Sequence, residues 1–98
     1  MSDSSRAPIS VVLVDDDPMV RTALAMILGG APEITVVAQA EDGRQGVSVV
    51  AERSPDVVLM DIRMPRLDGL AATDELVRSG SPSKVIVLTT FDADDDVM

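Results

Sequence analysis

Short apolar runs alternate along the chain with segments in which apolar residues recur at helical spacing. The runs are rich in valine, isoleucine and leucine, as is typical of strands buried on both faces of a parallel sheet. The segments between them are typical of amphipathic helices that cover such a sheet. The pattern predicts strands at 9–14, 34–40, 57–60 and 84–88, with a helix after each of the first three and the start of another at 91–98.

The ends of the predicted helices carry the residues that usually begin and end helices. Glycine or proline follows the helices, as at Gly29-Gly30 and Ser54-Pro55. An aspartate precedes each helix, and a lone aspartate at such a place is usually a turn residue or an N-cap. We therefore interpret four aspartates as caps, namely Asp17, Asp42, Asp68 and Asp92. The run 94–96 is interpreted as a solvated acidic helix start.

The order of elements predicts the fold class. Strands that alternate with helices indicate an α/β protein with a parallel sheet and helices on both faces. The 98 residues suffice for one domain. We expect a disordered leader at 1–8 and the domain at 9–98.

Composition and charge exclude several kinds of chemistry. The chain has no cysteine and no histidine, which excludes disulfides, thiolate metal sites and imidazole bases. Its net charge of −9 disfavours direct contact with nucleic acid, which needs basic surface. The polar N-terminus lacks a signal sequence, and no apolar run has the length of a membrane span. We expect a cytoplasmic protein without a membrane partner.

Acidic residues and a hydroxyl stand directly after three of the strands. Asp15 and Asp16 follow the first strand, Asp61 follows the third, and Thr89 follows the fourth. Ligands of open α/β sheets lie at the carboxyl ends of the strands, so the three carboxylates meet if the first and third strands are neighbours. Such a cluster favours Mg²⁺, and a carboxylate there can attack phosphorus to form an aspartyl phosphate.

Three motifs make the sequence resemble the receiver domain of two-component response regulators, particularly the NarL/LuxR type. They are V-L-V-D-D-D-P at 12–18, D-I-R-M-P-R-L-D-G at 61–69 and L-T-T-F-D at 88–92. The resemblance covers about residues 9–98, and its middle motif is the most specific. It implies a flavodoxin-like three-layer fold with strand order 2-1-3-4-(5), and phosphorylation by a sensor histidine kinase.

The resemblance also implies a role for individual residues. Asp61 would be the phosphoacceptor. Asp16 would bind Mg²⁺ directly, and Asp15 would bind it directly or through water. The backbone carbonyl of Arg63 would be a further metal ligand. Thr89 would be the switch hydroxyl that moves toward the phosphoryl group, and Gly69 would shape the loop after Asp61.

The sequence departs from the family pattern after its fourth strand. The family has a fifth strand that ends in a phosphoryl-binding lysine, and a fifth helix, neither of which this chain contains. Its one lysine, Lys84, precedes the fourth strand and so lies at the opposite end of the sheet. We expect an incomplete receiver whose apolar fourth strand, an open edge, is covered by further chain or by a second copy in a homodimer. DNA would be bound only through a C-terminal domain outside these residues.

Two alternatives to a phosphorylation-controlled signalling domain, which is not a turnover enzyme, stay open on the sequence. One is a phosphohydrolase of the haloacid dehalogenase type, with Asp15 as nucleophile and Asp17 as acid and base. The other is a receiver-like interaction module that is never phosphorylated. The position of the nucleophile distinguishes the hydrolase, since its Asp-x-Asp follows the first strand and not the third.

Overall fold

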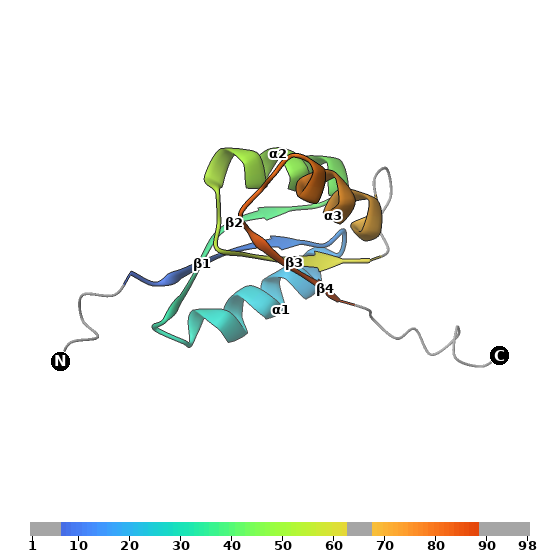
Figure 1. The fold of residues 1–98 in the computed structure, drawn as a ribbon. Helices are drawn as coiled ribbons and strands as arrows, with labels where there is room; N and C mark the ends of the chain where they lie inside the picture. Colours follow the sequence, from blue (N-terminus) through green and yellow to red (C-terminus); the bar gives the residue numbers. More distant parts are fainter. Residues whose placement is uncertain (1–6, 63–67, 89–98) are drawn as a thin grey trace.

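Four parallel strands form one sheet in the order β2-β1-β3-β4 in the computed structural model, which describes residues 7–62 and 68–88. Helices α2 and α3 cover one face of this sheet, and α1 lies on the other (Figure 1). The elements in chain order are β1 (Ile9–Val14), α1 (Pro18–Gly29), β2 (Ile34–Ala40), α2 (Gly43–Arg53), β3 (Val57–Asp61), α3 (Gly69–Arg78) and β4 (Lys84–Leu88).

This architecture confirms the predicted fold class and the order of its first four strands. The one difference in strand length is at β3, which extends one residue further than predicted and includes Asp61. The reason is that Asp61 still pairs with Leu88 of β4, and the next amide, of Ile62, donates to the Leu88 carbonyl at 3.1 Å. The predicted helix at 91–98 and most of the predicted leader lie outside the described residues.

The main core lies between the sheet and the two helices α2 and α3. Alternate residues of β1 and β3 point into it, as expected for strands in which successive side chains face opposite ways. Aliphatic residues and one methionine fill the cluster, which consists of Val12, Val14, Ala40, Val50, Val58, Met60, Ala72 and Leu76. The two strands that carry the acidic residues therefore contribute four of the eight residues of this cluster, namely Val12, Val14, Val58 and Met60.

Three of the four predicted caps are confirmed. The side chain of Asp17 accepts a hydrogen bond from the Met19 amide, and Asp42 and Asp68 accept from the amides of Gln45 and Ala71. These bonds satisfy amides that have no partner inside the helix. Asp92 and the acidic run 94–96 lie outside the described residues.

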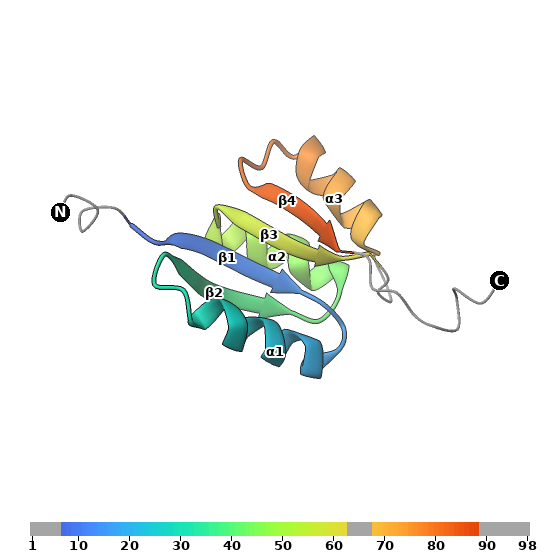
Figure 2. The ribbon, with the colours of Figure 1, turned by 90° about the horizontal axis from the view of Figure 1, so that it is seen from below.

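The apolar stripe of α1 is only partly covered. Its Leu24 and Leu28 are half-buried, whereas Ile27 is 71% exposed, and α1 has no fully buried residue. The helix runs beside β2 and β1 and away from β4 (Figure 2), so part of its stripe lies beyond the strands it contacts. On the part of the sheet that is described, β4 is an edge strand and Ile86 is 50% exposed.

Asp56 forms several hydrogen bonds at the amino-terminal end of the sheet. Asp56 accepts from both the amide and the hydroxyl of Ser10, and its carbonyl accepts from the amide of Lys84. Lys84 thus stands at the end of the sheet opposite Asp61, as predicted. Within residues 7–62 and 68–88, no helix combines the length and the apolar character that crossing a membrane would require.

Candidate functional site

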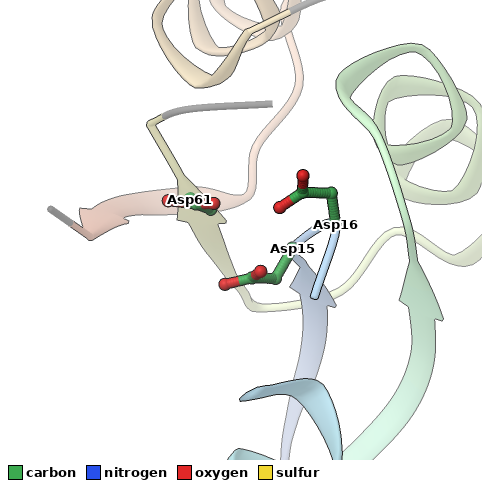
Figure 3. A group of neighbouring side chains, drawn as sticks. All are labelled: Asp15, Asp16 and Asp61. Atoms are coloured by element: carbon green, nitrogen blue, oxygen red, sulfur yellow. The ribbon is translucent and has the colours of Figure 1, made fainter. Parts of the chain in front are cut away.

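Three carboxylates meet at the carboxyl end of the two central strands (Figure 3). Asp15 and Asp16 directly follow β1, and Asp61 is the last residue of β3. Because β1 and β3 are hydrogen-bonded neighbours, one oxygen from each carboxylate lies within 4.8 Å of the others. Asp15 and Asp61 are buried, and Asp16 is exposed, so the cluster opens to solvent on the side of Asp16.

Asp15 is held at three points. Its amide donates to the carbonyl of Ala40 at 3.1 Å, its Oδ1 accepts from the amide of Asp17 at 2.8 Å, and its carbonyl accepts from Nη1 of Arg21 at 2.6 Å. Bonds to the amide, the carbonyl and the side chain leave little freedom at this residue. The turn after β1 therefore presents the Asp15 carboxylate in one orientation.

Asp61 is held by close contact of its main chain with the start of α3. The Gly69 amide donates to the carbonyl of Ile62 at 3.1 Å. A Cβ added at Gly69 would overlap the carbonyl oxygen of Asp61 and lie 2.8 Å from its carbonyl carbon. Only glycine allows this approach, so the residue that resemblance assigned to loop shape sets the distance between α3 and Asp61.

The cluster concentrates negative charge at a partly buried site. Burial raises the pKa of the Asp15 carboxyl, and the neighbouring charges of Asp61, Asp16 and Asp17 raise it further. The hydrogen bond from the Asp17 amide acts in the opposite direction. A divalent cation would offset the repulsion between the carboxylates. The all-oxygen donor set suits a hard ion such as Mg²⁺. The residues therefore fit the predicted metal.

The raised pKa predicts that Asp15→Asn stabilises the metal-free protein at neutral pH. The carboxyl of Asp15 binds its proton more tightly in the native protein than in the unfolded chain. Its contribution to stability therefore falls as the pH rises from the ordinary pKa of 3.8 through the raised pKa. The neutral amide keeps the bond from Asp17 and avoids this penalty. We expect a gain of about 1 kcal/mol, or ~4–8 °C in Tm.

Thermal unfolding in EDTA and in Mg²⁺ measures this effect. Added Mg²⁺ should stabilise the original protein more than Asp15→Asn, because a ligand stabilises the state that binds it. Asp74→Asn is the control, since Asp74 is an exposed residue of α3 paired only with Arg78 in the part of the chain described. A lower Tm for Asp15→Asn than for the original protein in EDTA would contradict the prediction.

The sequence indicated the three carboxylates, and the resemblance assigned Gly69 to the loop after Asp61, but Arg21 was not predicted. Arg21 and Gly69 are in contact with the main chain of Asp15 and Asp61, respectively. A signal for Arg21 existed, because a cation in the first turns of a helix opposes the helix dipole and so suggests a specific partner. Arg63 and Thr89, the predicted carbonyl ligand and switch hydroxyl, lie outside the described residues.

Comparison with known proteins places the chain in a family. Residues 11–98 match the response regulator receiver domain. The chain is 48% identical over 89 residues to the transcriptional regulatory protein LiaR of Bacillus subtilis, covering 91% of this chain and 42% of that protein. It is also 42% identical over 86 residues to a protein-glutamate methylesterase/protein-glutamine glutaminase of Desulfitobacterium hafniense, covering 88% of this chain and 22% of that protein.

The fold agrees with these matches. The receiver domain of a putative response regulator NarL from Mycobacterium tuberculosis superposes with a TM-score of 0.84 at 29% identity, covering 88% of this chain and 69% of that one. The chain spans less than half the length of LiaR, so the matches describe the receiver part of such proteins. With the family match, the strand order and the acidic cluster in agreement, the chain belongs to the response regulator receiver domains, and it resembles those of NarL/LuxR-type regulators.

Proposed function

We propose that Asp61 accepts a phosphoryl group from a sensor histidine kinase and that Mg²⁺ is held by Asp15, Asp16, Asp61 and the backbone carbonyl of Arg63. The observation that carries this proposal is the meeting of three carboxylates within 4.8 Å at the ends of two neighbouring strands. Receiver domains are signalling domains and not turnover enzymes, so the phosphorylated state of the domain carries the signal.

The chemistry needs a nucleophile beside a region of positive charge. A carboxylate oxygen of Asp61 forms a bond to phosphorus, and the bond from phosphorus to the donor breaks, leaving the electron pair with the donor. When bound, Mg²⁺ supplies charge that offsets both the carboxylates and the phosphoryl oxygens. Asp15 and Asp16 are the residues of this chain that hold that charge beside Asp61. The resemblance assigns Thr89 to bind a phosphoryl oxygen as the switch.

The geometry disfavours the hydrolase alternative. In that mechanism Asp15 attacks phosphorus and Asp17 transfers a proton. Here Oδ1 of Asp15 already accepts from the amide of Asp17, and the side chain of Asp17 caps α1 by accepting from Met19 at 2.9 Å. Asp17 is also outside the cluster of converging carboxylates. Its position suits a helix cap and not an acid-base residue.

The output is proposed from relatives. LiaR is a transcriptional regulatory protein, and its likeness to this chain supports control of a DNA-binding domain outside these residues. The methylesterase shows that similar receivers also occur in proteins whose output is enzymatic. The receiver alone therefore does not determine the kind of output. We place the protein in the cytoplasm, with a kinase as partner, and we expect β4 to be covered by further chain or by a second copy.

Intact-mass measurement tests the proposal. A version of the protein that continues through the fifth strand and the fifth helix is incubated with acetyl phosphate, with Mg²⁺ or with EDTA, and the mass is read before the acyl phosphate hydrolyses. We expect a mass increase of one phosphoryl group that requires Mg²⁺. Binding of Mg²⁺ without any such adduct would favour the interaction module that is never phosphorylated.

A further inference from the structure

We propose that Arg21 is a positioning residue of the acidic site, which holds the main chain of Asp15 so that its carboxylate stays in place for the metal. This inference rests on the proposed function, since it concerns the same metal. Arg21 is in α1, on the opposite face of the sheet from the main core, and its side chain reaches back to the turn after β1. Nη1 donates to the carbonyl of Asp15 at 2.6 Å.

A second contact fixes the guanidinium itself. Nε of Arg21 donates to the side-chain carbonyl of Gln39 at 3.3 Å. Gln39 lies in β2, opposite Leu13 of β1, and precedes Ala40, whose carbonyl accepts from the Asp15 amide at 3.1 Å. The planar guanidinium thus joins α1, β2 and the end of β1 with donors in a rigid arrangement. These bonds tie the metal-binding turn to two elements that do not carry metal ligands.

The charge of Arg21 and its hydrogen bonds predict opposite effects on the binding of Mg²⁺. A positive charge near the start of a helix opposes the helix dipole. It also repels a divalent cation bound to the adjacent carboxylates. If Arg21 acted only through its charge, removing that charge would increase the affinity for Mg²⁺. If Arg21 acts by positioning Asp15, removing it lowers the affinity, so the two explanations predict opposite signs.

Calorimetric titration of the full chain with Mg²⁺ measures directly whether the affinity rises or falls. Calorimetry is suitable because the chain has no tryptophan or tyrosine whose fluorescence could report binding. In Arg21→Met, which keeps the aliphatic stem, we expect Kd for Mg²⁺ to rise about tenfold, as for other residues that orient metal ligands. Arg21→Lys should recover part of this affinity, because an ammonium group can still donate to the Asp15 carbonyl. The titration is made far below the unfolding temperature, where a loss of stability alone would not change the Kd for Mg²⁺.

Arg78→Met is the matched control. It makes the same change at an exposed ion pair with Asp74, in the last turn of α3. We expect its Kd for Mg²⁺ to equal that of the original protein. A Kd for Arg21→Met that is unchanged or lower would overturn the positioning role. If Arg21→Met does not fold, Gln39→Ala decides the matter, with a higher Kd supporting the role and an unchanged Kd overturning it.

Asp16→Asn separates failure of this inference from failure of the proposed function. If Asp16→Asn loses Mg²⁺ binding while Arg21→Met binds normally, the metal site stands and only the positioning role is wrong. If the Kd is the same in Asp16→Asn as in the original protein, the metal is not bound by this cluster, and the proposed function fails with the inference that rests on it.

Discussion

Gly69→Ala is expected to destabilise the fold by about 3 kcal/mol, the upper part of the range for overpacking a buried site. The new Cβ would overlap the carbonyl oxygen of Asp61 and approach the Cα of Ile62 to 2.8 Å. Both are main-chain atoms, so no side-chain rotation relieves the contact. Either α3 moves away from β3, or the end of β3 moves with Asp61. The variant should therefore lose Mg²⁺ affinity as well as stability.

Two other glycines provide matched controls for denaturant unfolding. Gly29 is the last residue of α1 and has no atom within 4 Å of an added Cβ, so Gly29→Ala should be neutral or stabilising by up to about 1 kcal/mol. Gly46→Ala meets the side chain of Val14 at 2.9 Å, which can shift slightly, so its effect should be intermediate. Equal unfolding midpoints for Gly69→Ala and Gly29→Ala would show that the α3 contact is not tight.

Asp61→Asn is expected to abolish the phosphoryl adduct completely. The amide has nearly the same shape as the carboxylate, but it lacks the negative oxygen that attacks phosphorus. The charge of Asp61 also raises the pKa of Asp15, so the neutral variant removes repulsion from the cluster. In EDTA the variant should consequently be at least as stable as the original protein, and loss of the adduct is then a chemical effect.

Asp56→Asn is the control for this experiment. Asp56 is an exposed aspartate at the amino-terminal edge of the sheet, where it binds Ser10. Its variant should form the adduct to the same extent as the original protein under the same acetyl phosphate and Mg²⁺. An adduct that persists in Asp61→Asn would remove Asp61 from the proposed role.

The sequence predicted the sheet and the three acids because both depend on local patterns. Apolar runs located the strands, and the carboxyl ends of parallel strands share one end of the sheet. The position of Asp15 beside Asp61 followed only from the strand order that the resemblance implied. The supporting contacts could not be predicted in the same way. The bonds of Arg21 join residues from α1, β1 and β2. They depend on the crossing of helix and sheet, which no spacing within one segment reveals.

The exposure of residues on α1 was also beyond local patterns. Ile27 has the helical spacing of a buried residue, yet it is 71% exposed because α1 is displaced toward β2. Gly69 could be recognised as part of a motif, but the reason that no side chain fits there is its contact with the main chain of Asp61. In each case the deciding quantity is a distance between elements that are separate in the sequence.

Chemical trapping of the phosphoryl group tests the central claim most directly. Borohydride reduces an acyl phosphate to an alcohol, so a phosphorylated aspartate becomes homoserine, which peptide mass spectrometry locates in the chain. After treatment of the full chain with acetyl phosphate and Mg²⁺, we predict homoserine at position 61 and at neither Asp15 nor Asp16. Homoserine at position 15, the nucleophile of the hydrolase alternative, or its absence from position 61 in a phosphorylated sample, would contradict the assignment of Asp61 as the phosphoacceptor.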